Sequence, residues 1–166
     1  DLQTSAFDGA IGFNVGNGSA KVKGAEVSGR WRPVPAFTLS GSVAYLDFEW
    51  TKYAGQCYFG RTPDAGTNCN YDGFTNQLAP KLTGVASGDY RWDVAGNLEV
   101  HAVLDMVYSS KFLQSLTLDP ANTQKAFAKL NARFSVGDVN DRWEVALVGR
   151  NLTDKTTVSY AGDTPL

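Results

Sequence analysis

Apolar residues recur at every second position over much of this chain, a period that is typical of β-strands. The alternation is strict over 98–108, where every even position is apolar, and over 37–45 and 126–136. We therefore predict seven strands, within 2–7, 20–32, 37–53, 82–92, 98–109, 126–136 and 143–149. Most are about 10 to 14 residues long, whereas about 5 or 6 residues is usual in globular proteins.

The predicted connections alternate between long and short. Residues 9–19, 54–79 and 111–123 form the long ones, and residues 33–36, 93–96 and 137–141 the short ones. Aromatic residues lie beside the short connections: Trp31, Phe37, Tyr90, Trp92, Phe134 and Trp143. Ten strand residues tilted by about 40° rise roughly 25 Å, the height of the apolar band of an outer-membrane barrel. The pattern therefore favours an all-β, antiparallel, up-and-down transmembrane β-barrel segment.

The polar positions between the apolar ones carry charges in the middle of the strands. They are Glu99, His101, Asp105, Lys129, Arg133, Glu144 and Arg150. In a barrel these side chains face a polar lumen and can pair with one another. The apolar rows include small residues such as Ala102, Ala132 and Gly41, which suit contact with lipid better than the core of a sandwich. A soluble β-sandwich, with the apolar rows as its core and the polar rows solvated, is the alternative.

Composition removes other classes of protein. The longest apolar runs, 43–46 and 145–148, are far shorter than the roughly 20 residues of a membrane-spanning helix. The formal net charge is −2 and no Lys/Arg cluster occurs, so we expect no nucleic-acid partner.

Two cysteines, Cys57 and Cys69, lie in a stretch rich in Gly, Asn and Asp. Two thiols do not complete a zinc site, and the single histidine, His101, is distant in sequence. We predict a structural disulfide formed in an oxidising compartment, worth about 3 kcal/mol in the chain-entropy model. We predict no metal site and no cofactor.

Several short motifs, taken in order, resemble those of TonB-dependent outer-membrane receptors. The first is Asn17, six residues, then Gly24, a small apolar residue and Glu26. It is followed by the runs Trp-Arg-Pro (31–33), Ala-Tyr-Leu-Asp (44–47), Ala-Pro-Lys (79–81), Leu-Asn-Ala-Arg (130–133) and Gly-Arg-Asn-Leu-Thr-Asp (149–154). Each motif is weak alone, but their order and their places on strands and loops are those of the family.

The resemblance implies a bacterial outer-membrane protein with a 22-stranded barrel around a plug domain that carries the TonB-contacting box. Residues 1–166 would then be a partial barrel domain, corresponding to strands 15 to 21, without the plug, the box or the last strand. The implied function is TonB-dependent, ligand-gated uptake of a scarce, bulky nutrient. The ligand is commonly a ferric siderophore and sometimes cobalamin or an oligosaccharide. The implied partners are outer-membrane lipid, and TonB through the plug.

Within this chain, the loop between 54 and 79 is the candidate for contact with the ligand. The candidate residues, including Tyr53 just before it, are Tyr53, Tyr58, Phe59, Arg61, Asp64, Tyr71, Asp72 and Phe74. Aromatic rings supply contact area at low entropic cost, and Arg61 would suit an anionic chelate. The alternative is that these residues only pack the loop against its neighbours.

Two other functions use the same strands. A soluble extracellular β-sandwich could hold carbohydrate with its long loops, and an outer-membrane barrel could be an enzyme. His101 and Asp105 lie about 13 Å apart along a strand, too far for an acid–base pair. No phosphate-binding loop, nucleophile elbow or metal-spaced cluster occurs. We therefore expect no enzymatic activity.

Overall fold

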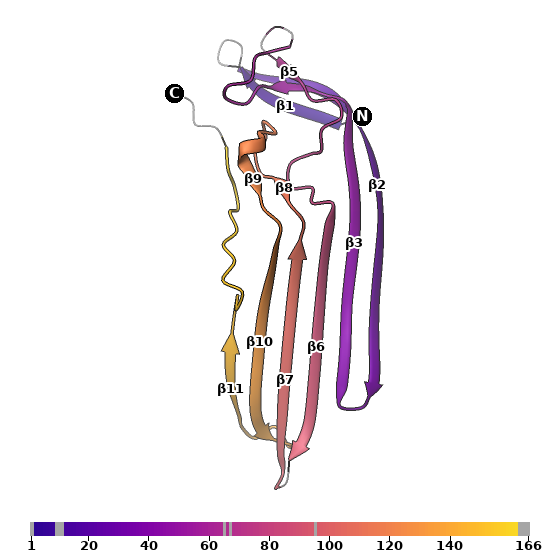
Figure 1. Cartoon of the computed structure of the whole chain (residues 1–166), viewed down its shortest axis with the longest axis vertical. Helices are drawn as coiled ribbons and strands as arrows, with labels where there is room; N and C mark the ends of the chain where they lie inside the picture. The colour runs from indigo at the N-terminus through magenta and orange to yellow at the C-terminus, as the bar shows by residue number, and fades with distance from the viewer. Residues whose placement is uncertain (1, 9–11, 65, 67, 95, 163–166) are drawn as a thin grey trace.

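In the computed structural model, seven strands form one antiparallel sheet in which neighbours in sequence are neighbours in space. The structure describes residues 2–8, 12–64, 66, 68–94 and 96–162. The strands are β1 (Leu2–Asp8), β2 (Gly12–Val34), β3 (Phe37–Lys52), β6 (Leu82–Val94), β7 (Leu98–Ser109), β10 (Phe127–Asp138) and β11 (Glu144–Gly149). Figure 1 shows the long strands side by side in a single layer. The predicted number of strands and their up-and-down order are confirmed.

The two ends of the sheet differ in their connections, as predicted. At the turn end, residues 35–36, 95–97 and 139–143 join consecutive strands. At the loop end, residues 53–81 contain a small hairpin of β4 (Ala54–Gln56) and β5 (Asn68–Asn70). The second long loop contains β8 (Phe112–Leu113), the 3₁₀ helix η1 (Pro120–Asn122) and β9 (Thr123–Gln124). Figure 1 shows both loops gathered at the same end of the sheet.

The first predicted long connection, 9–19, is wrong over 12–19, and residues 9–11 lie outside the described residues. Strand β2 begins at Gly12, and its first residues pair with β1, from Asp8 with Gly12 to Leu2 with Gly18. Gly and Asn residues favour turns and loops, but over 12–18 hydrogen bonding to β1 keeps the backbone extended. From Ser19 onward, β2 pairs with β3 instead, and β1 lies at the loop end of the sheet (Figure 1).

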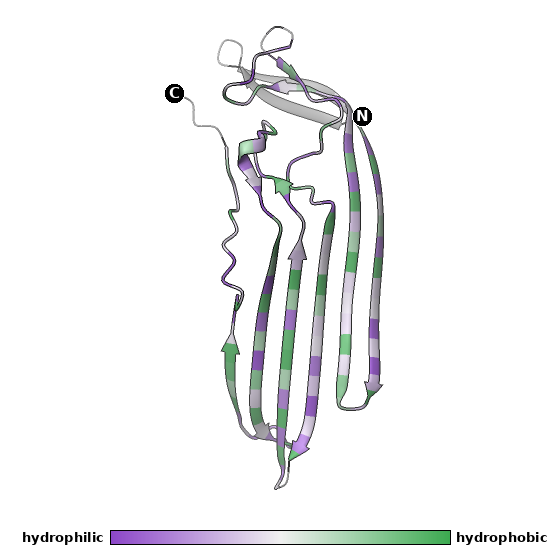
Figure 2. Cartoon of the chain, viewed as in Figure 1, coloured by the Kyte–Doolittle hydropathy of each residue, from purple (hydrophilic) through white to green (hydrophobic). Residues whose placement is uncertain are grey.

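The strand register aligns the apolar rows into one continuous apolar face. Ala102 of β7 lies between Tyr90 and Phe134, and Leu104 lies between Gly88 and Ala132. Along β3, β7 and β10, apolar and polar residues alternate in colour in Figure 2. The apolar face is solvent-exposed in this chain, with Leu147 at 76% exposure. Because the remaining sheets among the described residues have only two strands each, no second sheet covers either face, and the predicted alternative of a β-sandwich is not observed.

Aromatic side chains form a band near the turn end, on the apolar face. Phe37 and Tyr90 are 6.2 Å apart between ring centroids, Tyr90 and Trp92 are 5.0 Å apart, and Trp92 and Phe134 are 6.4 Å apart. The band thus crosses from β3 to β10. Such a band is typical of the interface between membrane and water. Among the described residues, no helix is long and apolar enough to cross a membrane.

Candidate functional site

The character of the two faces reverses near the loop end of β3. From Phe37 to Tyr45 the odd residues are apolar, and they lie on the exposed apolar face. Beyond Tyr45 the even residues are apolar instead: Leu46, Phe48 and Trp50. Because side chains alternate across a strand, these residues extend from the face that is polar nearer the turns. This reversal was not predicted, although the change of phase at 45–46 is visible in the sequence.

Strand β2 undergoes the same reversal opposite β3. Val22 lies opposite Phe48 and Ala20 opposite Trp50. On the other face, the register places Lys21 opposite Glu49 and Lys23 opposite Asp47. Near the loop end of β2 and β3, charged residues therefore replace apolar ones on the outward face. At the same level, apolar residues appear on the inner face. The long loops pack against this inner apolar surface.

The packed loops have a hydrophobic core of their own. Trp50, Cys69, Tyr71 and Leu118 are buried, and Leu118 comes from the second long loop. A series of ring contacts runs through the core: Trp50 to Tyr53 at 4.5 Å, Tyr53 to Tyr71 at 5.7 Å and Tyr71 to Phe74 at 5.4 Å between centroids. Four of the five largest fully buried side chains of the described residues lie in the loops, namely Tyr71, Leu118, Cys69 and Ser115, and the fifth, Ser135, lies on β10.

The disulfide between Cys57 and Cys69 is present, as predicted. It links the end of β4 to the middle of β5, since Cys69 lies opposite Gly55 in the hairpin register. Cys69 is fully buried, and its sulfur lies 3.6 Å from the carbonyl oxygen of Thr62. The disulfide therefore joins the hairpin to the loop core, and its role is structural.

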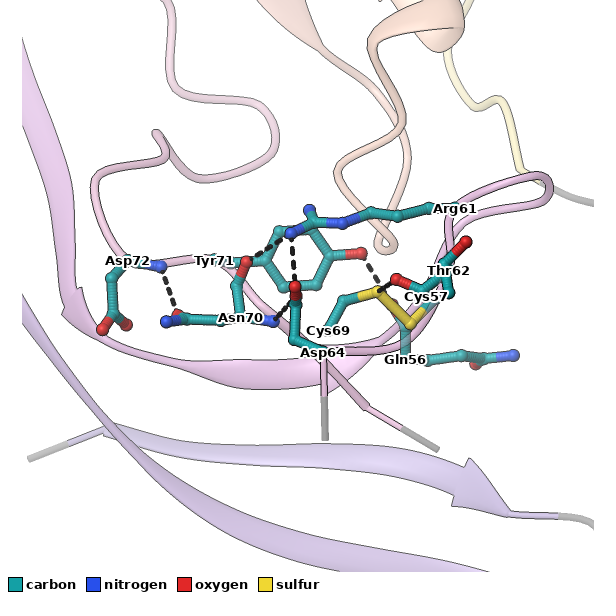
Figure 3. A network of polar contacts seen from close by, with 9 residues as sticks. All are labelled: Gln56, Cys57, Arg61, Thr62, Asp64, Cys69, Asn70, Tyr71 and Asp72. Atoms are coloured by element: carbon teal, nitrogen blue, oxygen red, sulfur yellow. Dashed lines mark hydrogen bonds and ion pairs between the residues drawn. A yellow bond between two sulfur atoms is a disulfide. The ribbon is translucent and has the colours of Figure 1, made fainter. Parts of the chain in front are cut away.

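Arg61 anchors the tip of the first long loop (Figure 3). Its guanidinium donates hydrogen bonds to the carbonyl oxygen of Asn70 at 2.7 Å and to Oδ2 of Asp64 at 3.1 Å. It also lies 4.7 Å from the ring centroid of Tyr71 and 5.4 Å from that of Phe74. Only 19% of the Arg61 side chain is exposed. A guanidinium held by a carboxylate, a carbonyl and two rings is fixed in position.

The tyrosines of the loop core stay neutral. The hydroxyl of Tyr71 donates to the carbonyl oxygen of Gln56 at 2.8 Å (Figure 3). Burial raises the pKa of Tyr71, while the charge of Arg61 opposes that rise. Burial also raises the pKa of Tyr53, whose backbone N–H donates to Oδ1 of Asp72 at 2.8 Å.

The predicted ligand-loop residues therefore divide into two groups. Most of them take part in packing the loop: Tyr53, Tyr58, Arg61, Tyr71, Asp72 and Phe74. Phe59, 77% exposed, extends from the loop surface. Asp64 is also exposed, but it accepts hydrogen bonds from Arg61 and from the backbone N–H of Asn70. Contact of these residues with a ligand stays a prediction. The sequence did not separate the two groups because their residue types are the same.

The polar face carries ion pairs, and a hydrogen bond between His101 and Asp89, that join neighbouring strands. Nε2 of His101 lies 2.8 Å from Oδ2 of Asp89 on β6, a pairing that spacing along one strand did not reveal. Arg133 pairs with Glu144 at 2.5 Å, and Arg91 lies 3.8 Å from Glu99. The predicted residues Glu99, His101, Arg133 and Glu144 line one hollow of about 430 Å³.

The other predicted lumen residues lie apart from this hollow. Asp105 is half-buried and lies opposite Ser87 and Asn131 in the register. Nζ of Lys129 donates to Oγ1 of Thr157 at 2.8 Å, and Arg150 directly follows β11 and is exposed. In the described part of the chain, no group of three or more His, Cys, Asp or Glu residues is placed to hold a metal ion.

This arrangement defines a class of protein. The chain forms one antiparallel sheet with an exposed apolar face and a charged opposite face. Short turns with aromatic residues lie at one end of the sheet, and packed loops lie at the other. Together these features are those of part of the wall of a transmembrane β-barrel. The family model described as "TonB dependent receptor-like, beta-barrel" matches residues 1–152. The chain therefore belongs to the TonB-dependent receptor family, as the sequence motifs predicted.

A solved structure with the same fold is that of the siderophore receptor PiuA from Acinetobacter baumannii. The TM-score is 0.64 at 23% sequence identity, and the alignment covers 92% of this chain. It covers only 20% of the PiuA chain, so this chain spans about a fifth of that receptor's length. Among curated proteins no match is found.

Proposed function

We propose that residues 1–166 are a partial barrel domain of an outer-membrane receptor that takes up a bulky nutrient in a TonB-dependent manner. The observation that carries the proposal is the family match over 1–152. The apolar face would contact outer-membrane lipid and the polar face would line the lumen. TonB would act through a plug domain. The family consists of transporters and receptors, so no catalytic role is assigned.

For the ligand we propose a ferric siderophore bound at the loop end. Two observations support this choice: the structural neighbour is a siderophore receptor, and the loop end presents aromatic and polar side chains on a packed core. Arg61 is already paired with Asp64, so the proposed contacts run through exposed residues, with Phe59 foremost. An exposed ring offers contact area to a bulky chelate at low entropic cost.

The test is uptake by cells that express the full-length receptor. Hydroxamate and catecholate siderophores loaded with radioactive iron are the probes, with cobalamin and an oligosaccharide as comparison ligands. We expect uptake of one ferric siderophore that disappears when TonB is deleted. Phe59→Ala should lower that uptake several-fold, whereas Trp31→Ala, which changes an exposed ring near the turn end, should not. Uptake of cobalamin or oligosaccharide alone would refute the ligand, and uptake without TonB would refute the mechanism.

A further inference from the structure

The apolar face of the sheet contains an open hollow between β2, β3 and β6, with a volume of about 370 Å³. On this face its lining residues are Val27, Gly29, Leu39, Gly41, Val43 and Ala86, and the chain between these positions completes the lining. In the strand register, Gly29 lies opposite Gly41, and Gly41 lies opposite Ala86. The floor of the hollow therefore consists of small residues at one level across three strands, and larger apolar side chains surround it.

Packing within the chain does not account for the missing side chain at Gly29. A Cβ atom added there would meet no atom within 4 Å, and the residue lies inside the regular strand β2. Gly41 differs, because a Cβ atom there would lie 2.8 Å from the carbonyl oxygen of Val85. Glycine weakens the interior of a strand and often marks a place where a ligand approaches closely. Gly29 therefore leaves room for a group from outside the chain.

The apolar surface continues from the hollow toward the loop end and finishes at a charged rim. On β3, Val43 is followed on the same face by Tyr45 and then by Asp47. Tyr45 lies opposite Ala25 of β2 and Leu82 of β6, so apolar or aromatic residues cover all three strands at that level. The rim beyond Tyr45 consists of Lys21, Lys23, Asp47, Glu49 and Lys81.

Lysines outnumber carboxylates at this rim. Asp47 forms an ion pair with Lys81 at 3.2 Å and lies opposite Lys23 in the register, so two lysines share one carboxylate. Lys21 lies opposite Glu49. Lys23 is exposed and forms no ion pair with any residue that the structure describes. The rim therefore offers positive charge directly above an apolar surface, which is the arrangement that an anionic lipid complements.

We propose that the hollow and the rim together bind one membrane lipid with an anionic, phosphate-bearing headgroup. The phosphate contacts Lys23 and Lys81, and the end of one acyl chain lies in the hollow. Gly41 and Asp47 are six residues apart, about 20 Å along the strand. At a tilt of about 40° this is about 15 Å of depth, half of the roughly 30 Å hydrocarbon core of a bilayer. A lipid with its phosphate at the rim therefore places the end of its chain at the level of the hollow.

A lipid uses both ends of this site, whereas other occupants use only one. A free phosphate ion would contact the lysines and leave the hollow unused. A second copy of the chain packed on the same face would bring its own excess of lysines to the rim, and like charges placed opposite each other are unfavourable. The inference rests on the proposed function in one respect: the apolar face must lie in the outer membrane.

The test is native mass spectrometry of the full-length receptor reconstituted with phosphatidylglycerol, which is anionic, or with phosphatidylcholine of the same acyl chains, which has no net charge. Gly29→Leu fills the hollow. Its matched control is Ala132→Leu, which adds the same side chain to the apolar face on β10. Lys23→Gln combined with Lys81→Gln removes the charge of the rim. Its matched control is Lys125→Gln, which changes an exposed lysine just before β10.

We expect the wild-type receptor to retain phosphatidylglycerol at least several-fold better than phosphatidylcholine. Gly29→Leu and the double lysine variant should each lower that retention several-fold, and the two controls should not. Equal retention of the two lipids would overturn the proposal, and so would a lipid-free dimer of receptors that dissociates in Gly29→Leu. The lysine variants change only exposed side chains, so they test the rim even where Gly29→Leu fails to fold.

The readout needs no siderophore, which separates this proposal from the proposed function. Loss of siderophore uptake with lipid retention intact would count against the proposed function alone. Intact uptake without selective retention of phosphatidylglycerol would count against the lipid site alone.

Discussion

Strand β3 passes through two regions. Apolar and polar residues alternate in both, but the apolar residues lie on opposite faces of the sheet. Between Phe37 and Tyr45 the apolar side chains point outward, and Val43 and Tyr45 are about half exposed. Between Leu46 and Trp50 they point inward, and Trp50 is only 4% exposed. The first region resembles a wall in lipid, where the described residues leave the apolar side chains exposed. The second resembles a water-soluble domain, where the chain buries them itself.

The change between the two environments therefore falls between Tyr45 and Leu46. On the outward face, Tyr45 is followed by Asp47, which forms an ion pair with Lys81 at 3.2 Å. Charged residues on the lipid-facing side of a barrel are costly at the middle of the membrane and tolerated near its surface. Asp47 and Lys81 therefore lie where the apolar outward face of β3 gives way to a charged one.

The largest expected effect is in the loop core. Trp50→Ala should destabilise the loop end by about 3–5 kcal/mol, because it leaves a cavity beneath Tyr53 and Phe48. Hydrogen exchange of loop amides in the full receptor measures the loss. Trp31→Ala, at 62% exposure on the wall, is the control and should leave these amides unchanged. Equal effects of the two substitutions would erase the distinction between the regions.

In the wall, a substitution that adds a charge should lower stability more than one that leaves a cavity. Val43→Arg places a guanidinium on the lipid-facing side near mid-wall and should cost about 2–4 kcal/mol in a bilayer. Urea titration of the receptor folded into vesicles measures this. The neighbouring substitution Ala44→Arg puts the same group on the polar face and should cost much less. A larger penalty at position 44 would reverse the assignment of the two faces.

Loss of the disulfide should loosen only the loop end. Replacing both Cys57 and Cys69 by Ser should lower the local stability of the loop by about 3 kcal/mol, since the bond restricts the unfolded loop. Limited proteolysis of the loop reports the change, and the same protein treated with reductant should match the variant. The strands of the wall should keep their exchange rates. Faster exchange in β7 or β10 would mean that the two regions are coupled.

The smallest expected effect is at the loop tip. Arg61→Lys keeps the charge but loses the planar fork that bonds Asp64 and the Asn70 carbonyl oxygen, so we expect a local cost of about 1 kcal/mol. Exchange of the Asn70 amide, whose N–H donates to Asp64 at 2.8 Å, measures it. Asp64→Asn should have a similar effect. An unchanged Asn70 amide in both variants would show that packing alone holds the tip.

Local sequence reasoning succeeded where the period of the chain carries the information. Strands β3, β6, β7 and β10 were predicted nearly to their ends because they span many residues of strict alternation. The prediction failed over 12–18, where Gly and Asn favour a loop but pairing with β1 supplies the hydrogen bonds of a strand. It also missed the pair of His101 with Asp89, since cross-strand partners depend on register, which the spacing within one strand does not specify.

The sequence by itself determined that the chain forms long antiparallel strands with one apolar and one polar row, and that Cys57 and Cys69 are joined. It also identified the family through motifs in the right order. Only the tertiary structure decided which loop residues are buried and which are exposed, because Tyr71 and Phe59 are similar in chemistry and differ in what packs around them. The charge balance of the polar face was likewise decided in three dimensions, since ion pairs form between strands brought together by register rather than by sequence.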